Sequence, residues 1–214
     1  MDRTELRRIL DEAPADARER IGHVGMRTGQ LFGWITGPDQ EFIATWLPKV
    51  SREWSGPMKI VEVGTFAGST ARGLIAFSGG GTITCIDNMV DVHAGARGHH
   101  ASGRAFWEDT IKSNGVDFSS YATLIEGESR DVGLQWKDTI DLLFVDGDHH
   151  EEPAFTDLSL FGMHVVTGGY CLVDDYDMPD VVRACDRYFD GRWRTVHRPD
   201  GATAKIIAYQ RVAP

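Results

Sequence analysis

Cysteine is scarce in this sequence, which argues against a metal site built from cysteines. The 214 residues include 3 cysteines, Cys85, Cys171 and Cys185, and their spacing is not that of a metal site. Cys85 and Cys171 lie in short apolar runs. We therefore expect the three to be reduced residues of the core.

Positive charge is also in short supply. The chain has 22 Lys and Arg residues against 32 Asp and Glu residues, a formal net charge of -10 and an isoelectric point near 5.2. Phosphate binding by nucleic-acid-binding proteins relies on clustered Lys and Arg, and no such cluster is found. The composition thus argues against a nucleic-acid partner and favours a small-molecule ligand.

Long apolar runs are missing as well. The first residues, MDRTELRRILDEA, are charged at helical spacing and lack the apolar centre of a signal peptide. No apolar run reaches the roughly 20 residues that a membrane-spanning helix needs. We expect a soluble, cytoplasmic protein without a membrane partner.

The chain is long enough for one well-packed domain, and no Pro/Ser/Gly-rich linker divides it. Residues 1–57 are expected to form an N-terminal helical cap or lid, with helices at residues 5–10 and 38–54. The glycine-rich residues 29–37 between them are a candidate entry loop. Residues 58–214 would form the core.

From Lys59 onward, short apolar runs alternate with segments of helical length. Strands are expected at MKIVEVG, TITCIDN, ATLIEG, DLLFVDGD and GGYCLVDDY, and helices at STARGLIAF and at residues 105–114, 153–164 and 179–189. WRTVHR and TAKIIAYQR then predict a closing hairpin around residues 199–201. This order predicts an α/β fold with a mostly parallel sheet and helices on both faces. Ligands of such sheets bind beyond the carboxyl ends of the strands.

The segment VEVGTFAGST, residues 61–70, runs from a strand through a glycine turn into a helix. Such a turn lets a ligand approach the backbone and the helix N-terminus. Phe66 stands where the dinucleotide fingerprint has its second glycine, which disfavours NAD and FAD. No lysine follows Gly68, so the segment is not a phosphate loop of the P-loop type.

The second predicted strand ends in Asp87, 23 residues after Gly64. A carboxylate at that place can accept hydrogen bonds from both ribose hydroxyls. The alternative is a helix cap or loop carboxylate. Residues 127–129, GES, end the third strand, where an adenine edge would lie. These features together predict a ligand that contains adenosine but no pyrophosphate.

At this point the sequence resembles a known family, the class I S-adenosylmethionine-dependent methyltransferases. VEVGTFAGST, CIDN and EGES are similar to the family's cofactor-binding, ribose-binding and adenine-side motifs, and the resemblance extends from about residue 59 to 211. It implies a Rossmann-like three-layer sandwich with a mostly parallel seven-stranded sheet and a C-terminal antiparallel hairpin. Residues 140–176 resemble metal-dependent small-molecule O-methyltransferases, distantly the catechol type and more closely bacterial enzymes that methylate sugar or aromatic hydroxyls of antibiotics.

The resemblance implies two sets of site residues. The residues expected to contact S-adenosyl-L-methionine are Glu62, Gly64, Thr65, Phe66, Gly68, Thr70, Asp87, Ser129 and Asp146. The residues expected to hold a metal ion are Asp146, Asp174 and Asp175. Glu62 would act on the loop backbone or on the methionyl amine, the alternative being a cap for a neighbouring strand end.

Asp146 ends the fourth strand, and Asp174 and Asp175 end the fifth, its neighbour in this fold. Neighbouring strands lie about 4.8 Å apart, so the three carboxylates should converge and need a cation to neutralise them. Oxygen ligands favour Mg²⁺, with Mn²⁺ or Ca²⁺ as substitutes. His149 and His150 keep zinc open as an alternative. The segment DGDHH, residues 146–150, could instead be a capping turn for the following helix.

Methyl transfer to a hydroxyl also requires a base. Asp148 is the first candidate, because the bacterial relatives have an acid at that place. His149, at the position of a lysine in catechol-type enzymes, is the second. Because that lysine is absent, a sugar hydroxyl is a candidate acceptor beside catechol. The acceptor pocket could include Trp34, Tyr176 and residues 88–107, a segment with His93, His99, His100 and Trp107.

Two alternatives to methyl transfer remain at this stage. The fold could serve non-methylating chemistry of a hydroxylase or cyclase type, or the chain could be a non-catalytic cofactor-binding protein. The sequence contains all three predicted metal ligands and a candidate base, which counts against a non-catalytic protein. The oligomeric state is open, with the N-terminal helices as a candidate contact of a homodimer or higher homo-oligomer.

Overall fold

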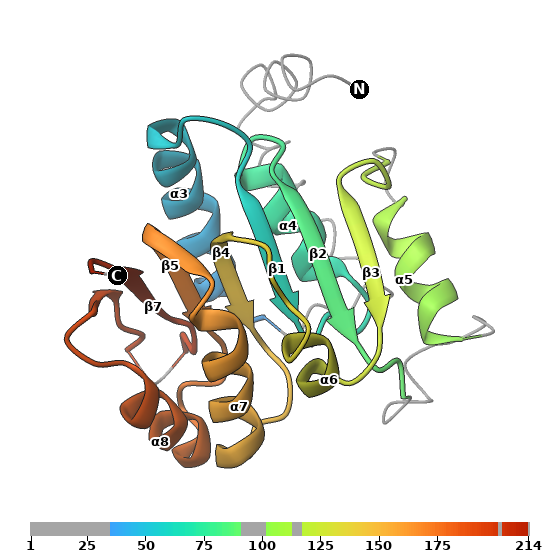
Figure 1. Cartoon of the computed structure of the whole chain (residues 1–214). Helices are drawn as coiled ribbons and strands as arrows, with labels where there is room; N and C mark the ends of the chain where they lie inside the picture. The colour runs from blue at the N-terminus through green and yellow to red at the C-terminus, as the bar shows by residue number, and fades with distance from the viewer. Residues whose placement is uncertain (1–34, 91–101, 113–116, 201–202, 214) are drawn as a thin grey trace.

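Seven strands form one sheet through the centre of the molecule (Figure 1). The computed structural model describes residues 35–90, 102–112, 117–200 and 203–213. The strands are β1 (Lys59–Val63), β2 (Thr82–Asp87), β3 (Ala122–Glu126), β4 (Ile140–Val145), β5 (Val165–Val173), β6 (Trp193–His197) and β7 (Ile207–Arg211), in the order β3-β2-β1-β4-β5-β7-β6. The first five are parallel, and β7 is antiparallel to both β5 and β6. The predicted fold class is therefore confirmed.

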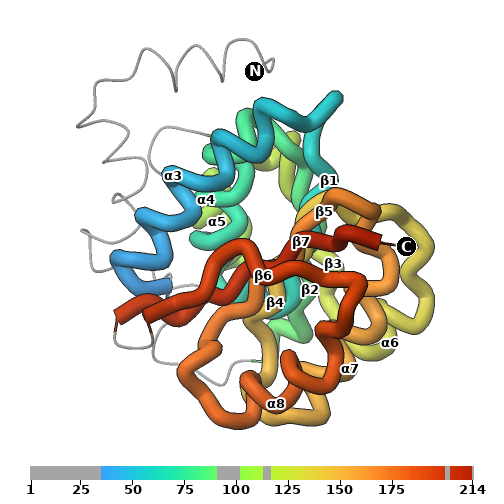
Figure 2. Tube along the Cα trace, turned by 90° about the vertical axis from the view of Figure 1, so that its left-hand side faces the viewer, coloured from blue at the N-terminus to red at the C-terminus, as the bar shows by residue number. Residues whose placement is uncertain are grey.

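Six described helices cover the two faces of the sheet. The first three are α3 (Gly37–Glu53), α4 (Ser69–Phe77) and α5 (Gly103–Ile111), and the others are α6 (Ser129–Gly133), α7 (Glu151–Gly162) and α8 (Pro179–Tyr188). Figure 2 shows α3, α4 and α5 on one side of the sheet and α6, α7 and α8 on the other. Each group packs along its own face, with α4 touching both α3 and α5 and with α7 touching both α6 and α8.

The central strands are buried because both faces are covered. In β1 every residue after Lys59 is buried, and in β4 only Asp141 is partly exposed. Such strands are continuous apolar runs rather than alternating ones. One core lies under α3, α4 and α5 and includes Leu47 and Phe144, and a second lies under α7 and α8 and includes Phe161.

Helix α3 belongs to the packed layer. Thr36 is its N-cap, and the Thr36 hydroxyl accepts a hydrogen bond from the Asp39 amide. Leu47 of this helix is fully buried, and α3 packs against α4. The predicted boundary between residues 57 and 58 falls between α3 and β1. The helix expected at residues 5–10, the pocket residue Trp34 and the loop histidines His93, His99 and His100 lie outside the described residues.

Several elements differ from the sequence prediction; for example, β5 begins at Val165, before the predicted GGYCLVDDY, and ends at Val173. Residues 129–133 form α6, where only a strand end was expected, because five residues are too few for a helical period to show. The last strand, β7, begins at Ile207, later than the apolar pattern of TAKIIAYQR indicated. The preceding Lys205 and Ile206 instead donate their backbone amides to a side chain of α3.

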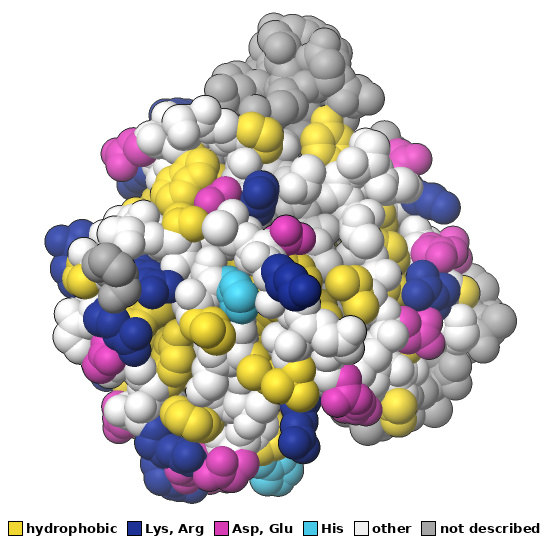
Figure 3. Space-filling model, in the orientation of Figure 1, with side chains coloured by type: hydrophobic (Ala, Val, Ile, Leu, Met, Phe, Trp, Pro, Cys, Tyr) yellow, Lys and Arg dark blue, Asp and Glu magenta, His cyan; other side chains and the backbone are white. Residues whose placement is uncertain are grey.

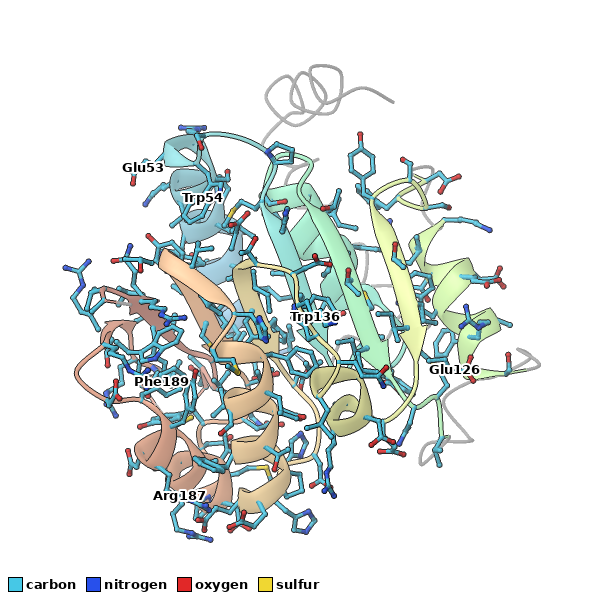
Figure 4. All side chains as sticks on the ribbon, viewed as in Figure 1. Glu53, Trp54, Glu126, Trp136, Arg187 and Phe189 are labelled. Atoms are coloured by element: carbon cyan, nitrogen blue, oxygen red, sulfur yellow. The ribbon has the colours of Figure 1, made fainter. Side chains whose placement is uncertain are left out.

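The carboxyl ends of the parallel strands share one edge, at the bottom of Figure 1. In Figure 4, Glu126 at the end of β3 marks this edge, and Glu53 at the end of α3 marks the opposite one. The chain leaves β1 toward β2 on one side, while β4 lies on the other side of β1. This change in strand order is where open α/β sheets bind ligands.

Two further features of the fold are the basic side chains beside its C-terminal strands and the character of its helices. Figure 3 shows Lys and Arg side chains gathered beside the C-terminal strands. There Arg192 and Arg194 are exposed, with hydrogen bonds to Asp190 and Gln210, and Trp193 is buried. None of the described helices has both the length and the apolar character of a membrane span.

Candidate functional site

The glycine loop after β1 packs directly on the end of β4. Gly64 has a φ of 84°, and a Cβ atom on it would lie 2.0 Å from the backbone oxygen of Asp146. Only glycine fits there, both for its backbone angle and for this approach. The glycine loop therefore lies against the turn that begins at Asp146.

The loop enters α4 through a second tight glycine. Gly68, the N-cap of α4, has a φ of 78° and, as a glycine, provides no side-chain cap. A Cβ on Gly68 would lie 2.7 Å from Cδ1 of Trp107, a buried residue of α5. Phe66 between the two glycines also has a positive φ, 45°. The loop is thus held in an uncommon backbone conformation, and its N-cap glycine leaves the first-turn amides of α4, Ser69 and Thr70, without a cap from that position.

Asp87, at the end of β2, is bound to the loop. One carboxylate oxygen accepts a hydrogen bond from the Phe66 amide at 2.8 Å, and the other accepts one from the Met89 amide at 2.8 Å. Each oxygen retains a further lone pair. Asp87 can therefore fix the loop and still accept hydrogen bonds from a ligand.

Glu62 is a fully buried acid beneath the loop. Burial raises its pKa to about 7. The thiol of Cys85 donates to one of its oxygens at 3.4 Å, and within the described residues the other oxygen, Oε1, has no hydrogen-bond partner. A buried acceptor without a donor is costly, so this oxygen marks a place where a ligand or a shift of the loop would supply one. The hydroxyl of Thr65, also buried, lies beside Glu62 and partly offsets the effect of burial on the pKa of that acid.

Ser129 begins α6, after the end of β3. Its hydroxyl donates to Oδ1 of Asp157 in α7 at 2.6 Å. Asp157 is almost fully buried, and burial raises its pKa to about 6. Its other oxygen lies under the turn after β4, where a Cβ on Gly147 would be 3.2 Å from it. Asp157, which the sequence analysis did not single out, thus connects the adenine-side residue to that turn.

Three side chains converge beyond β4 and β5. Ligand atoms of Asp146, His149 and Asp175 all lie within 4.8 Å of one another. Two of these are predicted metal ligands, and His149 was predicted as a base. The third predicted ligand, Asp174, is 5% exposed and accepts a hydrogen bond from the Asp175 amide at 2.8 Å, outside this group.

The surroundings of the three acids shift their pKa values in opposite directions. Hydrogen bonds from His149 and Lys205 to Asp175, the first the larger effect, lower the pKa of Asp175 to about 2. Burial raises the pKa of Asp174 to about 7. Burial, followed by repulsion from Asp174, raises that of Asp146 well above its usual value. The edge thus holds more carboxylates than its nearby cations neutralise.

Asp148 pairs with His150 and is not one of the three converging side chains. Oδ1 of Asp148 accepts a hydrogen bond from the His150 amide at 2.9 Å and also pairs with the His150 ring. Both side chains are largely exposed, and His150 is the N-cap of α7. In this arrangement Asp148 stabilises the turn into α7, which is the capping alternative. Asp148 remains a predicted base.

A family model described as a methyltransferase domain matches residues 61–176. This span runs from β1 past β5 and is more than half of the chain. The chain belongs to the methyltransferase domain family. The resemblance to methyltransferases is thereby confirmed, and the glycine loop, Asp87 and the acids after β4 and β5 all lie inside the matched residues.

Solved methyltransferase structures share the fold. An O-methyltransferase from Bacillus cereus in complex with SAH, S-adenosylhomocysteine, is 12% identical with a TM-score of 0.65, covering 98% of this chain and 97% of that one. The TDP-rhamnose 3'-O-methyltransferase of calicheamicin biosynthesis is 17% identical with a TM-score of 0.61, covering 99% and 93%. The O-methyltransferase NovP is 20% identical with a TM-score of 0.57, covering 81% and 79%.

A relative in sequence is an uncharacterized protein of Acanthamoeba polyphaga mimivirus. It is 34% identical over an alignment of 109 residues, and the match covers 47% of this chain and 43% of that protein. The match thus spans less than half of the relative's length.

Proposed function

We propose that this methyltransferase transfers a methyl group from S-adenosyl-L-methionine to a hydroxyl of a small molecule with the help of a divalent metal ion. One observation supports this most. Gly64 packs on the backbone of Asp146, so the glycine loop touches the cluster of acids formed by Asp146, Asp174 and Asp175. A cofactor on the loop would therefore present its methyl group next to any hydroxyl bound at the acids.

The loop suits the proposed cofactor. Asp87 offers carboxylate lone pairs to the ribose hydroxyls, and Ser129 is positioned by Asp157 near the expected adenine edge. Glu62 Oε1, which has no donor within the described chain, can accept a hydrogen bond from the methionyl amine directly or through the loop. Phe66 leaves no room for a pyrophosphate at its position, and this cofactor has none.

The acids suit a divalent cation. Carboxylate oxygens of Asp146 and Asp175, two of the predicted ligands, lie within 4.8 Å of each other, and Asp174, the third, adjoins Asp175. Burial raises the pKa values of Asp146 and Asp174, and neighbouring carboxylates add to the effect; a bound cation would stabilise the ionised form of both acids. Oxygen ligands favour Mg²⁺ or Mn²⁺, and a bound ion of this kind lowers the pKa of a coordinated hydroxyl and orients it.

The protein must then accept the hydroxyl proton. His149 faces the acids, and its Nε2 lies 2.9 Å from Oδ2 of Asp175. Asp148 is turned toward His150. We therefore place His149 first as the base and keep Asp148 as the alternative. Asp175 would hold the imidazole ring in position, which counts because orientation supplies a large part of the acceleration.

The acceptor is proposed to be a sugar or aromatic hydroxyl of a secondary metabolite. One structural relative acts on TDP-rhamnose. Tyr176, directly after Asp175, offers a ring for stacking, and Arg198 lies 5.4 Å from the centre of that ring and donates a hydrogen bond to its hydroxyl. This aromatic ring next to the acids could form one wall of an acceptor pocket.

Calorimetry tests the proposal directly. We expect S-adenosylmethionine and S-adenosylhomocysteine to bind the purified protein, and Mn²⁺ to bind a site that the double substitution of Asp146 and Asp175 by Asn abolishes. Absence of binding of both nucleosides, with and without Mg²⁺, would refute the cofactor assignment. Nucleoside binding without methyl transfer to any of a panel of sugars and phenols would favour the non-methylating or non-catalytic alternatives.

A further inference from the structure

The ammonium group of a lysine, Lys205, lies within this cluster of acids. Nζ of Lys205 lies 2.9 Å from Oδ1 of Asp175 and 3.6 Å from Oδ2 of Asp177. The other oxygen of Asp175 is bound by His149 at 2.9 Å. Both oxygens of a predicted metal ligand are thus already paired.

The position of Lys205 is fixed by its backbone. Its amide donates to both carboxylate oxygens of Asp39, at 3.0 and 2.9 Å, and its carbonyl oxygen accepts from the Tyr176 amide at 2.9 Å. Asp39 is fully buried and also accepts from the Ile206 amide at 2.9 Å. These bonds fix the backbone of Lys205 beside Asp175, while the flexible side chain can carry the ammonium group to either Asp175 or Asp177.

Lys205 and a metal ion would compete for the same carboxylate. An ammonium ion neutralises one charge and a divalent ion two, and they repel each other at contact distance. A metal ion that uses Asp175 must therefore weaken the contact of Lys205 with that residue. Asp177, 3.6 Å from Nζ, is a second carboxylate toward which the ammonium group can turn.

We propose that Lys205 is a positioning residue that holds Asp175 in place when no metal is bound, competes with the divalent ion for this carboxylate, and turns to Asp177 when the ion binds. This rests on the metal part of the proposed function. Lys205 thereby lowers metal affinity and keeps the negatively charged edge folded in the absence of metal.

The experiment measures Mn²⁺ affinity by electron paramagnetic resonance and calorimetry on the full chain. We expect Lys205→Met to bind Mn²⁺ about tenfold more tightly than the wild type, because the competing cation is gone. Lys205→Arg, which keeps the charge, should stay within about twofold of the wild type. Lys137→Met is the matched control, since Lys137 is an exposed lysine before β4, at the opposite edge of the sheet.

Asp177→Asn provides a second measurement that also works if Lys205→Met folds poorly. Without Asp177 the ammonium group has no second partner, so Mn²⁺ should bind more weakly than to the wild type. In a Lys205→Met background the same change should matter less, a coupling that a general loss of negative charge does not produce.

The outcomes separate the two proposals. Wild-type Mn²⁺ binding that Lys205→Met leaves unchanged or weakens would overturn the role of Lys205 and leave the metal site standing. No Mn²⁺ binding by the wild type or by Lys205→Met would overturn both the metal site and the role of Lys205. Mn²⁺ binding that appears only in Lys205→Met would support the competition directly.

Discussion

The carboxylate of Asp87 accepts a hydrogen bond from the backbone amide of Phe66 at 2.8 Å, which ties the end of β2 to the glycine loop after β1. The two residues are 21 positions apart in the chain. A single acid thus serves both as a support for the loop and as a candidate acceptor for a ribose. This double role makes Asp87 a sharp test of the cofactor site.

Asp87→Ala should weaken S-adenosylhomocysteine binding by about 10- to 100-fold, since hydrogen bonds to a charged group contribute about 1.5 to 3 kcal/mol each. Calorimetry measures the affinity. Asp138→Asn, at an exposed residue before β4 on the opposite edge, should leave it unchanged. Equal affinity in the wild type and Asp87→Ala would remove Asp87 from the cofactor site.

Gly64→Ala should destabilise the protein by about 3 kcal/mol or more, because the new methyl group would overlap the Asp146 backbone and the positive φ strains any side chain. Gly73→Ala is the matched control within α4. No atom lies within 4 Å of a Cβ at Gly73, so alanine should stabilise this helix by about 0.5 to 1 kcal/mol. Urea unfolding compares the two variants, and a mild effect of Gly64→Ala would contradict the close contact between loop and β4.

Asp157 predicts a dependence of stability on pH. Burial raises its pKa in the folded protein from 3.8 to about 6. The unfolded chain therefore loses this proton first, and the stabilisation present at low pH is lost as pH rises from about 4 to about 6. Asp157→Asn keeps an oxygen to accept from Ser129 and cannot ionise.

The stability advantage of Asp157→Asn over the wild type should grow across that pH range and level off above it, at about 1 to 3 kcal/mol. Thermal or urea unfolding at pH 4.5, 5.5, 6.5 and 7.5 measures the difference. An advantage that does not change with pH would mean that Asp157 ionises normally in the folded protein.

The two candidate bases should respond differently to substitution. With an acceptor found from the panel, His149→Ala should lower kcat by about 10²- to 10⁴-fold, the usual contribution of a general base. Asp148→Asn should lower it by less than about tenfold, since Asp148 pairs with His150. The reverse order would make Asp148 the base. A loss of Mn²⁺ affinity in His149→Ala would instead make His149 a metal ligand.

Asp39 should be important for stability although it lies far from the acids in sequence. Asp39→Ala leaves the buried amides of Lys205 and Ile206 without their acceptor, which should cost about 2 to 4 kcal/mol. Glu41→Ala, an exposed acid in the same helix, should change stability by less than about 0.5 kcal/mol. The denaturant midpoints of the two variants are compared with that of the wild type. Equal midpoints of Asp39→Ala and Glu41→Ala would contradict the role of Asp39 as an anchor.

Local patterns were enough to predict most of the fold. The helix predicted at STARGLIAF coincides with α4, and the strands around TITCID and IDLLFV lie where the apolar runs indicated, because buried parallel strands are continuous apolar segments. The pattern could not show α6, which is a single short turn of helix after β3. It also placed the start of β7 too early, since the amides before Ile207 are bound by Asp39 and not by a strand.

The sequence by itself determined which residues stand at the strand ends: the glycine loop after β1, Asp87 after β2, and acids after β4 and β5. These follow from short-range periodicity and turn chemistry. Only the tertiary structure decided which of them face each other. It turned Asp148 toward His150, brought His149 to Asp175, and brought in Lys205 from 30 residues further along the chain. Such pairings depend on side-chain direction and on strand order, which bring together residues that no local pattern connects.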